Sequence, residues 1–283
     1  MKAGIVGLPN VGKSTLFNCL SNAKAQSANF PFCTIEPNVG VVNVPDPRIK
    51  RLEELVNPEK VQPATVEIVD IAGLVKGASK GEGLGNQFLG NIRECSAIIH
   101  VLRCFENDNI THVEGSIDPI RDKETIDIEL QLKDLDTLEK RIDKHKKASK
   151  GGNKAEVKNV ETLESLKAYL ESGKSVRTFP RDEEQDELIS DCQFLTDKPI
   201  LYVCNVDESS AKTGNALVEK VREAVADENA EVIFLAAATE ADIAELEDYE
   251  ERQMFLEDIG LEEPGVNRVI RAAYKLLNLQ TYF

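Results

Sequence analysis

A glycine-rich segment near the N-terminus has the composition of a phosphate-binding loop. Residues 7–14 read Gly-Leu-Pro-Asn-Val-Gly-Lys-Ser and match the pattern G-x-x-x-x-G-K-[ST] at every fixed position. In such a loop, backbone N–H groups and the N-terminus of the following helix surround phosphate oxygens. The lysine places a positive charge on the β- and γ-phosphates, and the serine hydroxyl ligates Mg²⁺. The residues expected to contact a nucleotide here are Asn10, Val11, Gly12, Lys13, Ser14 and Thr15.

Two other segments could complete a site for the metal and the γ-phosphate. Residues 70–73 read Asp-Ile-Ala-Gly and follow a predicted strand, where D-x-x-G is the second phosphate-side element of GTPase-like domains. Asp70 would hold Mg²⁺ through water, and the Gly73 N–H would face the γ-phosphate. Thr34 lies in a loop after the first predicted helix, where a hydroxyl can close on the metal as it does in nucleotide-dependent switch loops. Ser14, Thr34 and Asp70 are therefore the predicted metal ligands.

A fourth segment concerns the base of the nucleotide. Residues 205–208 read Asn-Val-Asp-Glu and follow a predicted strand that ends at Cys204. A GTPase carries N-K-x-D at this place, and the aspartate of that motif reads the guanine. Here Val206 replaces the lysine and Glu208 replaces the aspartate, so the site loses most of its discrimination against adenine. We expect Asn205 and Val206 to contact the base of an ATP molecule, with Ala237 in the loop beneath it.

A sheet must bring these segments together. Short apolar, β-branched runs occur at residues 3–6, 39–44, 65–69, 97–102, 199–204 and 232–235, and helical patterns at 14–23, 86–95, 215–226 and 266–277. This alternation predicts an α/β fold with a mostly parallel sheet flanked by helices, like that of P-loop GTPases.

An inserted helical hairpin is predicted between the two halves of this pattern. Apolar residues recur at spacings of three and four within residues 157–170, and Gly151-Gly152-Asn153 separates that stripe from an earlier one. The earlier stripe consists of Ile128, Leu132, Leu135, Leu138 and Ile142. The pattern fits an antiparallel pair of helices, either an ordinary packed pair or an arm that binds a partner. We therefore divide the chain into a nucleotide-binding domain, first part (1–121), an arm (122–184), and the second part of the nucleotide domain with a C-terminal helix (185–277).

Composition and charge exclude several classes of protein. The 283 residues carry a formal net charge of -16, so bulk attraction to nucleic acid is not expected. The only dense basic run, residues 140–150, fits either a solvated helix face or a local patch. No apolar run of about 18 residues predicts a membrane span, and the N-terminus does not resemble a signal peptide. Six cysteines without a C-x-x-C pair indicate a reduced, cytoplasmic protein.

The chain resembles the YchF subfamily of Obg-related P-loop ATPases from residue 2 to residue 283. Residues 7–15, 29–38 and 70–86 carry the most specific part of the resemblance. The resemblance implies hydrolysis of ATP, often with GTP also accepted, together with Mg²⁺, an inserted helical arm and association with ribosomes. It also implies a C-terminal TGS domain, of which residues 278–283 would be the start, so that this domain is expected to be truncated.

The same resemblance points to His112 as the catalytic residue. Leu74 stands where Ras-like enzymes have a glutamine that orients the attacking water, and leucine has no group that can do so. An imidazole can position water or donate a hydrogen bond to the γ-phosphate. The other two histidines fit other roles, because His100 lies in an apolar run as a satisfied core residue and His145 lies among lysines.

Three functions remain compatible with these residues. The leading hypothesis is an ATPase whose nucleotide state changes the shape of a partner-binding surface. The alternatives are a regulatory GTPase that prefers GTP, and a nucleotide-binding module with negligible hydrolysis, which Leu74 keeps open.

Overall fold

A six-stranded sheet forms the centre of the molecule. The computed structural model describes residues 1–22, 39–71, 84–246 and 248–283, and within them the strand order is β2-β3-β1-β4-β5-β6. The strands are β1 (Lys2–Val6), β2 (Val39–Asn43), β3 (Thr65–Asp70), β4 (Ala97–Arg103), β5 (Ile200–Asn205) and β6 (Glu231–Leu235). All neighbouring pairs are parallel except β2 with β3. The predicted mostly parallel α/β sheet is confirmed.

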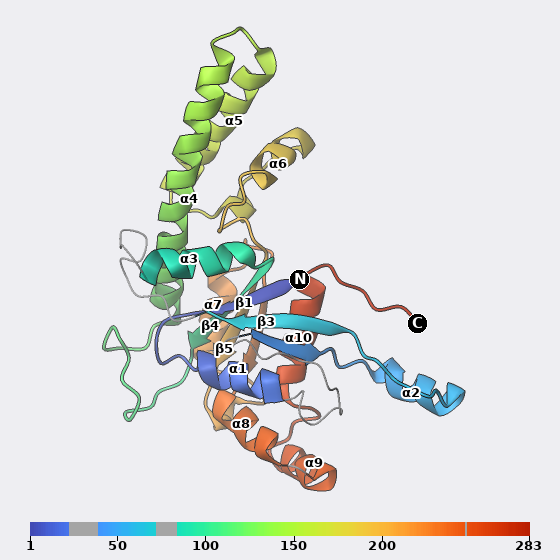
Figure 1. Ribbon diagram of the computed structural model, residues 1–283. Helices are drawn as coiled ribbons and strands as arrows, with labels where there is room; N and C mark the ends of the chain where they lie inside the picture. Colours follow the sequence, from blue (N-terminus) through green and yellow to red (C-terminus); the bar gives the residue numbers. More distant parts are fainter. Residues whose placement is uncertain (23–38, 72–83, 247) are drawn as a thin grey trace.

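Helices cover both faces of this sheet (Figure 1). α1 and α10 lie on one face, and α3 and the N-terminal part of α4 lie on the other. The helices are α1 (Lys13–Asn22), α2 (Pro47–Val56), α3 (Leu84–Glu94), α4 (Pro119–Ser149), α5 (Lys154–Glu171), α6 (Glu183–Ser190), α7 (Ala216–Ala224), α8 (Ala237–Glu245), α9 (Tyr249–Asp258) and α10 (Gly265–Leu276). None of the helices in the described part of the chain combines the length and the apolar character that a membrane crossing requires.

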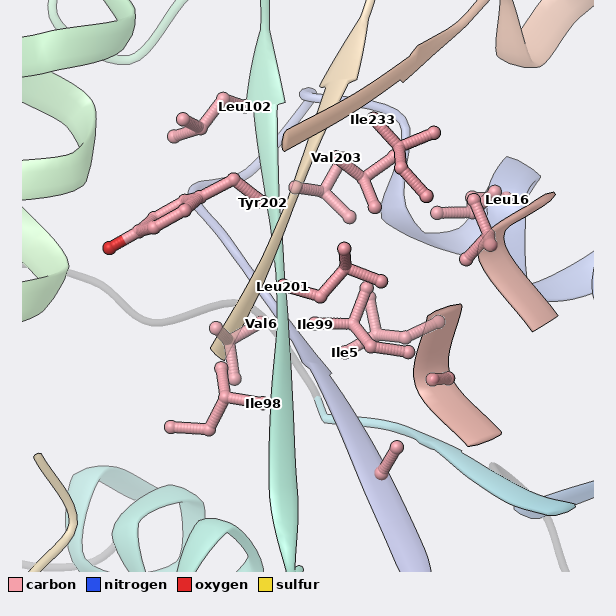
Figure 2. Close-up of a cluster of buried hydrophobic side chains, with 14 of the residues drawn as sticks. Ile5, Val6, Leu16, Ile98, Ile99, Leu102, Leu201, Tyr202, Val203 and Ile233 are labelled. Carbon is pink, nitrogen blue, oxygen red and sulfur yellow. The ribbon is translucent and has the colours of Figure 1, made fainter. Parts of the chain in front are cut away.

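The central strands are buried on both faces. Every residue of β4 and β5 is buried, which explains why their sequences read as continuous apolar runs without alternation. Figure 2 shows Ile98 and Tyr202 on one face of the sheet, and Ile99 and Leu201 on the other. Burying each such aliphatic side chain contributes about 1.5–3 kcal/mol. The core therefore fixes the strands whose carboxyl ends carry the polar segments.

The inserted hairpin projects from the sheet as the predicted arm (Figure 1). α4 has 31 residues and begins after the N-cap Asp118, and Asn153 caps the start of α5. Leu138 and Ile142 lie in the arm's own core, as the stripe predicted, and this core also includes Ile189, Cys192 and Phe194.

The first half of the predicted stripe is wrong. Ile128 is 52% exposed and Leu132 is 36% exposed. This part of α4 packs on the nucleotide domain with Ile126 and Leu130 instead, both of which belong to the main core. The buried face of α4 thus changes where the helix leaves the sheet, and a single apolar stripe cannot describe it.

A buried carboxylate joins the arm to the segment that precedes β5. Asp134 on α4 accepts hydrogen bonds from the backbone N–H of Leu195 at 2.7 Å and of Thr196 at 2.8 Å, and from the Thr196 hydroxyl at 2.8 Å. Burial raises the pKa of Asp134 to about 6, against the effect of these donors. The bonds fix the middle of α4 to the nucleotide domain.

His100 is a core residue, as expected, but not a satisfied one. It lies in β4 and is 1% exposed, and neither ring nitrogen has a hydrogen-bond partner among the described residues. Burial lowers its pKa to about 3, so the ring stays neutral in the folded protein. The Tyr202 ring packs beside it with the two centroids 5.6 Å apart.

This histidine should make the folded protein sensitive to acid. Its pKa is about 3 when folded and about 6.5 when unfolded, so the unfolded state binds the proton first as the pH falls. As the pH falls below 6.5, this residue should therefore lower the free energy of unfolding by up to about 1.4 kcal/mol per pH unit. Urea unfolding at several pH values should show a flatter pH dependence for His100→Leu than for the wild type. Equal slopes for the two proteins would contradict the assignment.

Candidate nucleotide-binding site

The phosphate loop connects β1 to α1 and needs both of its outer glycines. Gly7 has a φ of +154°, and a Cβ on it would lie 2.6 Å from the Val101 carbonyl oxygen. Gly12 has a φ of +99°, and a Cβ there would lie 2.3 Å from Nδ2 of Asn205. A side chain at either position would collide with an adjacent strand end, so the loop can take this path only with glycine.

Lys13 lies inside this loop. Its side chain is largely buried, and Nζ donates a hydrogen bond to the Leu8 carbonyl at 2.7 Å. Burial lowers its pKa, and the negative charge of Asp70 opposes that shift. An ammonium group in such surroundings is stabilised by further negative charge, which phosphate oxygens would supply.

Ser14 and Asp70 meet at the carboxyl ends of β1 and β3. The Ser14 hydroxyl donates to Oδ2 of Asp70 at 3.5 Å, and Oδ1 of Asp70 is buried without a hydrogen-bond partner in the described residues. Burial raises the pKa of Asp70, against the effects of Lys13 and Ser14. A hydroxyl and an unsatisfied carboxylate oxygen are the hard donors that Mg²⁺ prefers, so this pair fits the expected ion. The predicted ligand Thr34 and the predicted phosphate contact Gly73 lie outside the described residues.

Asn205 joins the loops on the base side of the site. Its Nδ2 donates to the Val11 carbonyl at 3.0 Å, and its Oδ1 accepts from the Ala237 N–H at 2.9 Å. The residue is 5% exposed. The structure thus brings together Asn205, Val11 and Ala237, three of the residues predicted to contact the nucleotide, and the amide of Asn205 holds the phosphate loop against the start of α8. One amide hydrogen of Asn205 is not used in these two bonds.

The two carboxylates that follow Asn205 have different surroundings. Asp207 caps the short 3-10 helix that begins at Glu208, accepting from the Ser210 N–H at 3.0 Å, the Ser210 hydroxyl at 3.1 Å and the Ser209 hydroxyl. The hydrogen bond from Ser209 is the largest cause of a lowered pKa at Asp207. Glu208, at the position of the guanine-reading aspartate, is exposed, and Val206 is buried.

His112 lies in the loop between β4 and α4, beside the phosphate loop. The preceding carbonyl, that of Thr111, accepts a hydrogen bond from Nδ2 of Asn10 at 3.1 Å. The ring itself is turned toward α4, with Nε2 2.7 Å from Oδ2 of Asp122, and Nδ1 accepts from the Glu114 N–H at 3.1 Å. Because Nδ1 accepts from a backbone N–H, the proton of the neutral ring is on Nε2 and is donated to Asp122.

A buried arginine that the sequence analysis missed shapes this loop. Arg103 at the end of β4 is 1% exposed, and its guanidinium donates to the carbonyls of Phe105 at 3.2 Å, Asn107 at 3.1 Å and Ile110 at 2.9 Å. Burial lowers its pKa, and Asp122 opposes the shift. The signal in the sequence was a single arginine at the end of a run that is apolar apart from His100, nine residues before His112.

Comparisons with known proteins identify close relatives of this chain. The family described as "50S ribosome-binding GTPase" matches residues 2–134. A protein of Bacillus subtilis is 56% identical over 285 residues, covering 100% of this chain and 78% of the relative. A protein of Escherichia coli O157:H7 is 57% identical over 282 residues, covering 100% of this chain and 77% of the relative. Both are named ribosome-binding ATPase YchF.

A solved structure confirms the fold over nearly the whole chain. The structure of the Schizosaccharomyces pombe YchF GTPase has a TM-score of 0.86 and 34% sequence identity. The match covers 98% of this chain and 76% of that one.

The role of Asn205 can be tested by substitution, with a variant of the nearby residue Glu208 as the control. Asn205→Ala leaves the Val11 carbonyl and the Ala237 N–H without their hydrogen-bond partner. We therefore expect a loss of about 2–4 kcal/mol in the free energy of unfolding. Nucleotide affinity should fall as well, by about tenfold or more, because the phosphate loop loses its support. Urea unfolding and titration with a fluorescent ATP analogue measure the two effects. Glu208→Ala, at an exposed position, should change neither the free energy of unfolding nor the nucleotide affinity. An Asn205→Ala protein as stable as the wild type would disprove that Asn205 holds the phosphate loop against α8.

Proposed function

Because this chain belongs to the YchF family of ribosome-binding ATPases, we propose that it is a Mg²⁺-dependent ATPase that acts as a nucleotide-controlled switch on the ribosome. The observation that carries the proposal is the arrangement of Lys13, Ser14 and Asp70 at the carboxyl ends of two parallel strands, the edge at which α/β sheets bind ligands. Association with the ribosome, and hence a cytoplasmic location, is inferred from the names of the relatives.

In the proposed chemistry, different residues of this chain bind the phosphates and the Mg²⁺ ion. Backbone N–H groups of the phosphate loop and the Lys13 ammonium bind and orient the β- and γ-phosphates, while Gly73 would face the γ-phosphate. Ser14 and Asp70, together with Thr34, would hold Mg²⁺, which supplies charge neutralisation on the phosphate oxygens when bound. The buried surroundings of Lys13 and Asp70 strengthen these interactions, since charges interact more strongly in a region of low dielectric constant.

ATP is the preferred substrate in this proposal, and GTP is accepted. Val206 and Glu208 replace the residues that read guanine, and Asp207 is occupied by the cap of its own turn. Asn205 would contact the base with its remaining amide hydrogen, above Val206 and Ala237. A GTP-preferring enzyme is the second candidate, because the S. pombe homologue is described as a GTPase.

His112 is proposed to position the attacking water. Leu74 has no hydrogen-bonding group, and the loop that carries His112 is attached to the phosphate loop through Thr111 and Asn10. The domain division proposed with this function is a nucleotide domain formed by residues 1–121 and 185–277, an arm formed by residues 122–184, and a further domain that begins at residue 278.

The phosphate contacts can be tested at Lys13. Lys13→Ala should abolish hydrolysis or weaken ATP binding by at least tenfold, because it removes a charge that lies on the phosphates. Isothermal titration and a phosphate-release assay measure the two properties, and thermal unfolding checks the fold. Lys147→Ala, at an exposed position on the arm, is the control. Normal binding and turnover in Lys13→Ala would refute the phosphate-loop assignment.

Base preference can be tested with a second pair of variants. The wild type should bind ATP at least as tightly as GTP, and Val206→Lys combined with Glu208→Asp should raise the affinity for GTP by restoring the guanine-reading pair. The single variant Glu208→Asp shows how much of the gain in GTP affinity comes from the shorter carboxylate without the lysine at position 206. Competition titrations with both nucleotides measure the ratio. A wild-type preference for GTP of tenfold, about 1.4 kcal/mol, would contradict the adenine assignment.

A further inference from the structure

The central sheet ends on one side at β6, whose outer edge pairs with no other strand among the described residues. The Leu235 carbonyl faces β5, because it accepts a hydrogen bond from the residue that follows β5. The backbone groups of positions 232 and 234 therefore point the other way. The Phe234 carbonyl agrees with this direction, since it accepts from the Arg268 guanidinium at 2.8 Å. Both backbone groups of Val232 and the N–H of Phe234 stay at the edge without a hydrogen-bond partner in the described part of the chain.

A groove runs along this edge between α7 and α10, which pack on opposite faces of β6. The Phe234 ring lies toward α7, with the Arg222 guanidinium 5.6 Å from its centroid. Leu235 faces the start of α10, because a Cβ on Gly265 would lie 2.9 Å from its own Cβ. Two adjoining open pockets of about 870 Å³ and 360 Å³ share the lining residues Arg222, Glu231, Val232, Ala272 and Lys275. The pockets therefore form one continuous groove with the β6 edge as its floor.

The groove is basic, although the protein carries a formal net charge of -16. Among the described residues that line either pocket, Glu231 is the one carboxylate. The cations are Arg222 on α7 and, at spacings of three and four on one side of α10, Arg268, Arg271 and Lys275.

The positive charge on the α10 side of the groove is only partly compensated. Arg222 pairs with Glu219, and Arg271 pairs with Glu263. Arg268 and Lys275 make no ion pair within the residues that the structure describes. A carboxylate brought into the groove would therefore meet two cations that have no carboxylate partner.

Proteins often protect an open strand edge with charged side chains, and β6 is protected at one end in this way. The guanidinium groups of Arg222 and Arg268 lie 5.6 Å and 5.4 Å from the centroid of the Phe234 ring, and Arg268 also covers the Phe234 carbonyl. This protection does not reach Val232, which lines both pockets. The carboxyl end of the edge is closed, and the amino end is open.

The open edge and its charge together specify an extended acidic peptide. Free backbone N–H and C=O groups pair with the main chain of an added strand, which is how many proteins bind peptides at a sheet edge. Alternate side chains of such a strand would face α10, where carboxylates are attracted by Arg268, Arg271 and Lys275. A nucleic acid would bring negative charge too, but its backbone has no N–H and C=O groups to pair with those of Val232.

We propose that the groove along β6 binds an extended acidic segment of a partner protein as an additional strand of the sheet. The segment pairs with the backbone of Val232 and directs its carboxylates toward α10. Its open part lies at the amino end of β6, whereas the phosphate loop and Asp70 lie at the carboxyl ends of their strands. Binding of the segment therefore requires neither nucleotide nor Mg²⁺.

The test measures fluorescence anisotropy of a fluorescein-labelled heptapeptide in which glutamate and valine alternate, titrated with the full chain. The peptide should bind the wild type, and its affinity should fall as the salt concentration rises, because salt screens the carboxylates from the cations. A peptide with lysine in place of each glutamate should bind at least about tenfold more weakly. The alternating peptide with N-methylated amides along one edge should show a similar loss, because it cannot donate to the Val232 carbonyl.

Two variants of the protein test the charge and the backbone separately. Lys275→Glu should weaken binding by about fivefold or more, and Lys220→Glu, at an exposed position of α7 outside the groove, should match the wild type. Val232→Pro removes an N–H that faces away from β5, so it should abolish peptide binding while the pairing of β6 with β5 remains. Thermal unfolding and titration with ATP check that each variant is folded. If Val232→Pro is not folded, the N-methylated peptide tests the same backbone pairing.

Several results would overturn the inference. One is the absence of binding of the alternating peptide to the folded wild type. Others are wild-type affinity in folded Val232→Pro, or equal affinity of the N-methylated and unmodified peptides, since either would show a contact through charge alone. An oligouridylate of matched charge that binds more tightly than the peptide, and is lost in Lys275→Glu, would assign the groove to single-stranded nucleic acid instead. The ATPase activity of the wild type has no bearing on these outcomes.

Discussion

The side-chain amide of Asn205 connects the parts of the nucleotide site. It donates to the Val11 carbonyl of the phosphate loop and accepts from the Ala237 N–H at the start of α8. These two segments follow β1 and β6, which are not neighbours in the sheet, so backbone pairing between strands cannot hold them together. Gly12 is required for the same reason, since any side chain there would occupy the place of the amide. The geometry of the phosphate loop therefore depends on a residue 194 positions away.

Burial is the second constraint on the site. Lys13, Asp70 and Arg103 all lie at the carboxyl edge of the sheet, and burial disfavours the charged form of each. Such a site fits a charged ligand, because a polyanion would stabilise the buried ammonium of Lys13 and a cation would stabilise the buried carboxylate of Asp70. Arg103 shows how the protein tolerates a buried charge without a ligand, since three carbonyls and the Phe105 ring surround its guanidinium.

Polar and apolar groups together attach the first part of α4 to the nucleotide domain, where Ile126 and Leu130 belong to the main core. Lys123, which pairs with Glu228, and Asp134 make the polar attachment, while Leu138, Ile142 and Leu166 belong to a separate core. Buried ion pairs and hydrogen bonds specify geometry more sharply than apolar contacts do, because they fail when donor and acceptor separate by about 1 Å. The first turn of α4, which carries Asp122, is therefore held in a defined position beside the loop of His112.

The sequence by itself determined the elements whose signals are local. The phosphate loop, Asp70, the six strands and the helical hairpin were all predicted, because glycine spacing, apolar runs and helical periodicity are properties of neighbouring residues. Only the tertiary structure decided which polar side chains meet. The partnership of His112 with Asp122, the carbonyls around Arg103, the unpaired ring of His100 and the exposure of Ile128 all depend on how α4 crosses the sheet. The helices α2, α6, α8 and α9 were missed as well. For α2 the reason is direct: none of its residues is buried, and its capping residues Asp46 and Pro47 are a weaker signal than an apolar stripe. Contacts between residues far apart in the chain leave no periodic pattern, and for that reason the sequence could identify the candidate catalytic histidine but not what holds it.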